Sequence, residues 1–272
     1  MDQQSSPNIK NKRAGGSFLI PGLLILIAII LLINNFLLLS NFNILSLLPL
    51  ALVILGLIIF VRGDLTLSTE SRTFGITRGS IQSATIEMNS GEVDVSISSL
   101  PNDNQGRLIA GQYAVKSRPQ LKVQDTYAHL IMNRFATNQI TLADWEFGLA
   151  NDLPWELLLN AGIGQLEVDC GNLILGGAKI FTGIGDIHFV SPPESLETIQ
   201  IHSVTGTIRF ATPADYRTRI LIKPSFRFFS THVNQERYQQ LDNHLYESLN
   251  PHPDAPLVEV EISGYLGDVF LI

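Results

Sequence analysis

The chain has 272 residues, of which 45% are hydrophobic, and its formal net charge at pH 7 is −7. This size allows one or two ordinary domains, and the acidic balance argues against nucleic acid and against an electrostatic hold on anionic lipid. Cys170 is the single cysteine, so no internal disulfide can brace the fold, which fits a reducing compartment.

A polar tail, residues 1–16, precedes two apolar stretches. From Ala14 to Val61 the sequence has no Asp, Glu, Lys, Arg or His. One membrane helix needs about 20 consecutive residues of mostly apolar character, so this stretch has room for two. We predict a transmembrane helical hairpin at 17–61, with spans at about 17–34 and 44–61, that contacts the lipid bilayer. The alternative is a cleaved signal peptide, which the length of the first run and the second run directly after it disfavour.

Basic residues flank the predicted hairpin and give its orientation. Lys10, Lys12 and Arg13 precede the first span, Arg62 follows the second, and the connecting loop carries no charge. The positive-inside rule therefore predicts a two-span protein of the cell membrane, with both termini and the part after the hairpin in the cytoplasm.

After a predicted linker at 62–80, a repeat with a β pattern begins. Gly164, Gly185 and Gly206 are 21 residues apart, and apolar residues alternate before and after each of them. Alternation with period 2 indicates strands, and a glycine between two strands indicates a corner that a side chain would not fit. We predict that residues 81–272 form an all-β repeat domain of stacked units, like a solenoid or a toastrack.

Two more copies of the pattern surround Gly91 and Gly267, in the same register as the array. A degenerate copy is expected after Gly206, where Ile220 and Ile222 continue the apolar column and Arg227 replaces the corner glycine. The alternative is an ordinary β-sandwich with similar hairpins. The two differ in whether position i lies beside position i+21, about 4.8 Å away.

Other segments are expected to be longer strands or irregular. Residues 107–117, 120–135 and 137–150 read as strands, and Trp145 and Trp155 are expected to cap the open end of the stack. The segment 231–257 is predicted to form either a short helix or a long polar loop. The helix would place on one face the residues Tyr238, Leu241, Leu245 and Leu249.

Two parts of the sequence resemble known families. The hairpin at 17–63, with its Leu- and Ile-rich spans, its loop NFLLLSNFN and the second span LLPLALVILG, resembles the transmembrane region shared by the LiaI and LiaF families. The stretch 152–213, with the repeated motifs NAGIGQLEVD, FTGIGDIHFV and HSVTGTIRFA, is similar to the β-repeat domain of LiaF-like cell-wall-active antibiotic response proteins, sometimes called a toastrack.

The resemblance implies a bacterial membrane protein without enzymatic activity that takes part in sensing cell-envelope stress, commonly by restraining a membrane histidine kinase. LiaF-like proteins often have more spans than the two predicted for this chain. No functional residue is carried over, because the family motif implies no defined ligand set.

The sequence offers no clear site for catalysis, a cofactor or a metal. It lacks an HExxH motif, zinc-spaced Cys and His residues, a GxSxG elbow and a phosphate-binding GKS/T loop. The GxG pairs at Gly162 and at Gly183 lie between two β segments, without the helix that a dinucleotide site requires. We therefore expect no catalytic residue, no cofactor and no bound metal.

One set of polar residues becomes adjacent if the units stack. Glu167, His188 and Arg209 each follow a corner glycine by three residues and are expected to point away from the core. They would form an exposed ladder of acid, imidazole and guanidinium groups. A sharper hypothesis is that His188 responds to pH or marks a docking face for a partner.

These observations lead to two functional hypotheses. The first is a membrane-anchored regulator of envelope stress that acts by protein contact, with a membrane histidine kinase as its partner. The second is a structural membrane scaffold that self-associates through a free edge of its last strand, at 258–272.

Overall fold

The computed structural model describes residues 53–54, 70–101, 106–114, 117–134, 144–249, 252 and 254–272, with the backbone alone at 224–227. The chain divides into one unit at Met1–Thr66 and a second, compact unit at Leu67–Ile272. Both predicted spans lie outside the described residues, apart from residues 53 and 54. Within the described ranges, no helix combines the length and the apolar character that crossing a membrane requires.

The described part of the second unit is built from strands, which confirms the all-β prediction. In chain order they are β1 (Ser71–Thr77), β2 (Ser83–Gly91), β3 (Val95–Ser99), β4 (Arg107–Ala114), β5 (Gln120–Gln124), β6 (Tyr127–Asn133), β7 (Trp145–Leu149), β8 (Pro154–Ile163), β9 (Leu166–Asp169), β10 (Ile174–Ile184), β11 (Ile187–Val190), β12 (Glu194–Ser195), β13 (Ile199–Thr205), β14 (Ile208–Ala211), β15 (Arg217–Val233), β16 (Tyr238–Asp242), β17 (Leu245–Ser248) and β18 (Leu257–Leu271).

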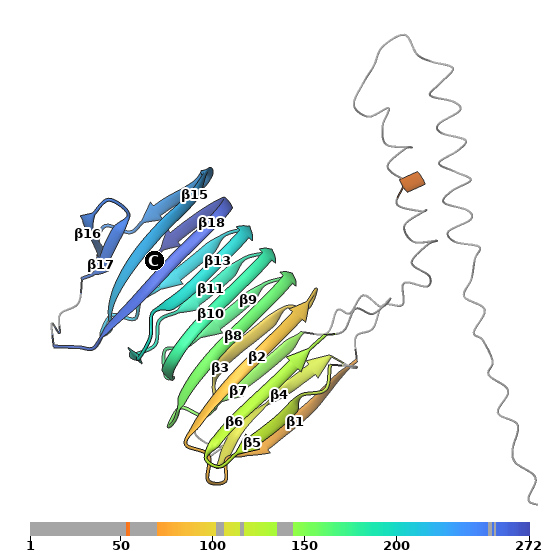
Figure 1. Cartoon of the computed structure of the whole chain (residues 1–272). Coiled ribbons are helices and arrows are strands. Elements are labelled where there is room, and N and C mark those ends of the chain that lie inside the picture. Colours follow the sequence, from red (N-terminus) through yellow and green to blue (C-terminus); the bar gives the residue numbers. More distant parts are fainter. Residues whose placement is uncertain are drawn as a thin grey trace, which may run out of the picture. The chain divides into compact units, whose positions relative to one another are not determined.

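The strands form two faces that enclose one core. One face, the long-strand face, has the order β5, β6, β2, β8, β10, β13, β18, β15, β17, β16. The other, the short-strand face, has the order β1, β4, β7, β3, β9, β11, β14, β18, β15. Strands β15 and β18 are long enough to cross from one face to the other. The result is a stack with β1, β4, β5 and β6 at one end and β15, β16 and β17 at the other (Figure 1).

The central rungs, each a strand, a corner and a second strand, stack in parallel as the 21-residue spacing predicts. Ile180 pairs with Leu159 on one side and with Ile201 on the other. Beyond the corner, Ile187 pairs with Leu166 and with Ile208 in the same way. The alternative of an ordinary sandwich is therefore wrong for β8–β14.

Four corner glycines stand in one column at positions that exclude a side chain. Gly164, Gly185, Gly206 and Gly267 have φ values of 147°, 151°, 146° and 133°. A Cβ on Gly185 would lie 1.8 Å from the carbonyl oxygen of Gly164, and the contact repeats at Gly206 and Gly267 at 2.0 Å. Backbones approach this closely because each corner rests directly on the corner of the next rung.

Side chains next to the corners also join neighbouring rungs. The backbone N–H of Thr207 donates a hydrogen bond to Asp186 Oδ1 at 2.8 Å, and that of Gln165 donates to Asp94 Oδ1 at 2.6 Å. These bonds satisfy backbone donors at bends where the sheet ladder is interrupted.

The first copy does not have the register that the alignment of glycines predicts. Ile86 was expected beside Leu159 but pairs with Leu157, and Val95 pairs with Leu166. Gly91 pairs with Ala161 rather than joining the glycine column, and its φ of 63° is that of a different turn. The shift is two residues, which keeps the same side chains facing the core, so alternation could not reveal it.

The C-terminal copy has the predicted register but an unexpected place in the stack. Strand β18 lies between β13 and β14 on one side and β15 on the other, so the last strand is not the free edge on which the scaffold hypothesis depended. Ile220 and Ile222 pair with Val260 and Ile262, as a degenerate rung should. After an irregularity between Pro224 and Phe228, however, Phe229 rather than Arg227 stands opposite Gly267.

Local structure corrects several other expectations. Strand β1 lies inside the expected linker at 62–80, and the segment 120–135 is the hairpin β5–β6, with a turn at Asp125, whose φ is 54°. Neither a helix nor a loop occupies 238–248, where β16 and β17 form an antiparallel hairpin.

The core is a series of aligned apolar rows. Phe189 and Phe210 are fully buried and stack with ring centroids 5.6 Å apart. Trp145 and Trp155 are buried too, but they do not cap an end. Trp155 lies on β8 between β2 and β10, and Trp145 lies on β7 between β3 and β4.

Candidate functional site

The predicted ladder residues stand side by side on the short-strand face. His188 on β11 pairs in register with Glu167 on β9 and with Arg209 on β14. His188 Nδ1 lies 4.0 Å from Glu167 Oε1, while the guanidinium of Arg209 lies 3.7 Å from Asp186 Oδ2. All three side chains are well exposed, so the row is a solvated ladder with weak internal pairing.

A groove of about 550 Å³ crosses the long-strand face, and we call it the polar groove. One row of it consists of three amides on neighbouring strands, which are Asn133, Asn89 and Asn160. The row continues through Phe181 and His202, whose rings stack with centroids 5.5 Å apart. Amides, aromatic faces and an imidazole thus converge on one surface.

Charged groups lie in the neighbouring row of the polar groove. Glu87, Lys179 and Glu261 lie in that row, and Glu87 and Glu261 already pair with His129 and with Lys223. Burial lowers the pKa of His202, whose Nδ1 lies 2.8 Å from Ser263 Oγ. The imidazole is therefore neutral at pH 7 and can bond as donor or acceptor.

A mostly apolar row runs along the corner, one residue before each glycine of the column and, on β15, one residue before Phe229, and we call it the corner ridge. Its members pair in register and are Ile163, Ile184, Thr205, Leu266 and Phe228. The four large side chains are exposed by 58%, 56%, 45% and 65%, in the order Ile163, Ile184, Leu266, Phe228. Single exposed apolar residues are ordinary, but an aligned row of four marks an interaction surface.

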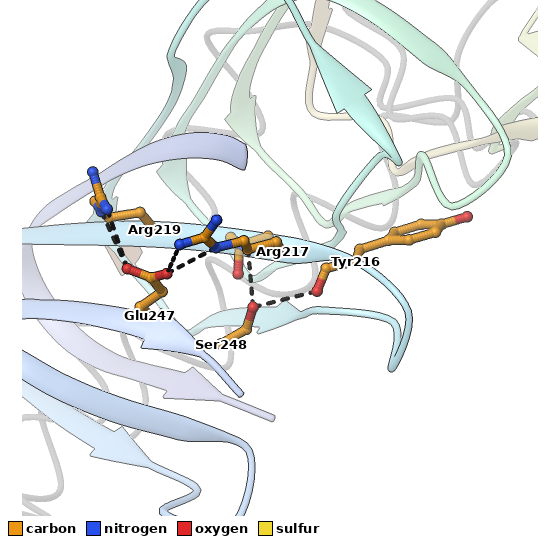
Figure 2. A network of polar contacts seen from close by, with 6 residues as sticks. Tyr216, Arg217, Arg219, Glu247 and Ser248 are labelled. Atoms are coloured by element: carbon orange, nitrogen blue, oxygen red, sulfur yellow. Dashed lines mark hydrogen bonds and ion pairs between the residues drawn. The ribbon is translucent and has the colours of Figure 1, made fainter. Parts of the chain in front are cut away.

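At the far end of the stack, Glu247 on β17 binds two arginines of β15. Arg217 donates from Nε and Nη2 to Oε1 at 2.9 and 2.7 Å, and Arg219 Nη2 donates to Oε2 at 3.2 Å. Ser248 accepts a bond from the backbone N–H of Thr218 and donates one to the carbonyl of Tyr216 (Figure 2). The network attaches the β16–β17 hairpin to β15.

We expect Glu247→Gln to destabilise the β domain by about 1.5–3 kcal/mol at pH 7, because hydrogen bonds to a charged group are lost. Burial raises the pKa of Glu247, but the bonds and charges of Arg217 and Arg219 outweigh it and hold the pKa below the ordinary value of 4.5. A lowered carboxyl pKa stabilises the fold above pH 4.5, and the contribution is lost as pH falls through the folded-state pKa.

Urea unfolding of the wild-type and Glu247→Gln chains at pH 7 and at several values below 4.5 measures this. The difference in unfolding free energy should shrink with acidity. Glu194→Gln, at an exposed position on β12, is the control and should show a difference near zero at every pH. A difference that stays constant with pH would mean that the pair with the arginines does not stabilise the fold.

Other reactive groups are not assembled into a site. Burial, and secondarily the Asp169 carboxylate, raises the pKa of the Cys170 thiol, which stays protonated and unreactive. Among the residues that the structure describes, no three His, Cys, Asp or Glu side chains are placed to hold a metal ion.

The described β unit combines stacked rungs with glycine corners and contains no helix. A comparison with known families finds a match for part of it. Residues 64–192 match the N-terminal domain of toast_rack, DUF2154. The toast_rack match runs from before β1 through β11, and it includes the turn at Gly91 and the first two corners of the glycine column.

Comparison with solved structures extends beyond the toast_rack match. One from Clostridium sporogenes, provisionally described as a cell adhesion protein, aligns with 75% of this chain and 99% of its own, at 15% identity and a TM-score of 0.61. One from Bacteroides fragilis, provisionally described as an adhesin, aligns with 77% of this chain and 100% of its own, at 9% identity and a TM-score of 0.34. Comparison with curated proteins gives no match. At these identities the likeness to the Clostridium protein establishes the fold alone.

Sequence reasoning identified the ladder and missed the two other surfaces of this toastrack-like domain. The corner ridge had a readable signal, since an apolar residue precedes Gly164, Gly185 and Gly267. The amide row had none, because Asn89 belongs to the shifted first copy and Asn133 to a strand outside the repeat.

Proposed function

We propose that this protein is a membrane-anchored, non-enzymatic regulator or sensor of cell-envelope stress that acts by contact with another protein. A membrane histidine kinase is the proposed partner, and the β domain is proposed to meet it at the cytoplasmic face. The toast_rack match and the LiaI/LiaF-like hairpin sequence support this proposal.

The observation that carries the proposal is the polar groove. Its amides, its stacked Phe181 and His202 and the ammonium of Lys179 are held by paired strands, so the surface is rigid before a partner arrives. Contact residues on a preformed surface lose little conformational freedom on binding. Aromatic side chains of this kind often supply much of an interface's binding energy.

The double variant Phe181→Ala with Lys179→Glu tests the groove. We expect binding to the kinase to weaken at least about tenfold, because losing one strong interface residue costs about 1–2 kcal/mol or more. A stress-responsive reporter in the native host should then respond to a cell-wall antibiotic as it does in a deletion strain. Abundance and far-UV circular dichroism should match the wild type.

Arg209→Ala, on the opposite face, is the matched control and should leave regulation intact. Loss of regulation in Arg209→Ala alone would move the docking surface to the ladder. Normal regulation in both variants and in the deletion strain would refute the regulator itself.

A structural membrane scaffold is the second candidate, and a free edge favours it. Among the described strands, β5 pairs with β6 alone, and all five of its residues are exposed. An exposed edge strand can pair with another chain. Large assemblies that disappear when Val123 is replaced by proline would support a scaffold over a regulator.

A further inference from the structure

The proposed function leaves the corner ridge without a role. Four large apolar side chains in a row are exposed to solvent although the fold offers a buried core nearby. With Thr205 at the centre they occupy five successive rungs at the inter-strand spacing, so the row extends about 19 Å along the stack. A mostly apolar row of this length marks a surface that another molecule covers.

The order of side-chain sizes along the corner ridge is the same from either end. Ile163 and Ile184 lie on one side of Thr205, and Leu266 and Phe228 lie on the other. The order is therefore large, large, small, large, large. A contact with twofold symmetry joins one patch to an identical patch that runs the opposite way, so the patch must complement its own reverse.

We propose that the corner ridge is the contact surface of a homodimer, with its twofold axis at Thr205. Thr205 then meets Thr205 of the second copy, where two small side chains let the corners approach closely. Ile184 meets Leu266, and Ile163 meets Phe228, so every large apolar side chain of one ridge is covered by one of the other.

The neighbouring row supports the same pairing. One position before the corner ridge, the rungs carry Gly162, Gly183, Val204 and Tyr265 in succession. Reversal about the axis sets the exposed Tyr265 against Gly183 of the second copy, which carries no side chain. A large side chain therefore faces a glycine on both sides of the axis.

Charges beside the corner ridge also allow the contact. The axis would bring Asp186 toward Asp268 of the second copy, but each carboxylate already has a partner on its own chain. Arg209 lies 3.7 Å from Asp186, and His232 lies 3.3 Å from Asp268. The acidic charge of the chain, −7, makes an anionic lipid surface a poorer occupant.

Disulfide trapping in native membranes tests the axis with the full chain. In a Cys170→Ser background, Thr205→Cys should form a disulfide-linked dimer upon mild oxidation, because the bond needs Cα atoms about 4.4–6.8 Å apart. Gln200→Cys, exposed on the same rung but on the long-strand face, is the control and should not cross-link.

Two differently tagged copies test the direction of the contact. Ile163→Cys in one copy should link to Phe228→Cys in the other, whereas Ile163→Cys should not link to itself, since those positions would lie about 19 Å apart. Adding Ile184→Glu should reduce Thr205→Cys cross-linking at least tenfold while circular dichroism stays unchanged. Ile184 is exposed, so this variant should fold.

Equal cross-linking at positions 205 and 200, or none at 205, would overturn the proposal. A yield of the Thr205→Cys cross-link that Ile184→Glu does not lower would also overturn it. A chain that carries both Ile163→Cys and Phe228→Cys separates two geometries: a closed dimer stops at two chains, whereas a ladder of higher oligomers would replace it with an open, head-to-tail assembly. The inference does not depend on the proposed regulatory role, because none of these readouts involves a kinase or a reporter.

Discussion

Gly185→Ala is expected to destabilise the β domain by about 2–6 kcal/mol, a large part of the stability of an ordinary domain. Two effects add at this corner. The φ of 151° is one that a residue with a side chain rarely adopts, which costs about 1–3 kcal/mol. The new Cβ would also lie 1.8 Å from the carbonyl oxygen of Gly164, so the rungs must separate, at a cost of about 1–3 kcal/mol.

Two glycines of the same domain separate these effects. A Cβ at Gly176 would make only an ordinary contact, 3.6 Å from the Trp155 carbonyl, so Gly176→Ala should be almost neutral. Gly79 has a φ of 58° with open space around it, so Gly79→Ala measures backbone strain alone. Midpoints of urea unfolding give the comparison. If Gly185→Ala costs no more than Gly79→Ala, the corners of neighbouring rungs are not in close contact.

Phe189→Ala is expected to destabilise the domain by about 3–5 kcal/mol, because a buried aromatic side chain is lost and a cavity remains. Phe189 is fully buried and stacks on Phe210 of the next rung, with ring centroids 5.6 Å apart. Parallel strands on both sides prevent the rungs from closing the space. Thermal and urea unfolding of the full chain measure the effect.

The matched control is Phe181→Ala, which removes the same side chain from the neighbouring strand β10. Phe181 is 38% exposed, and its ring stacks on His202 at the surface, so the loss should be under about 1 kcal/mol. Similar losses at positions 189 and 181 would show that the stacked core rows contribute less than their burial indicates.

The candidate surfaces were predictable only in part. Glu167, His188 and Arg209 could be aligned from the sequence because β9, β11 and β14 belong to copies with equal spacing. The polar groove could not, since its amide row joins strands from three different contexts. The corner ridge was visible up to Leu266, but Phe228 enters it only through the irregularity in β15.

The sequence by itself determined the repeating unit of this protein. Alternating apolar residues and glycines at equal spacing predict strands with corners, and the 21-residue period favours parallel stacking of β8–β14 over an ordinary sandwich, because stacking aligns the apolar rows. The buried and exposed sides of each strand follow from that alternation alone.

Only the tertiary structure decided the order and register of the remaining strands. A shift of two residues leaves the same side chains buried, so the pattern could not distinguish the observed pairing of Ile86 with Leu157 from its pairing with Leu159. Nor could it insert β18 between β14 and β15 or turn 238–248 into a hairpin. Those choices depend on which partner strand covers each apolar row, and that is a property of the assembled core.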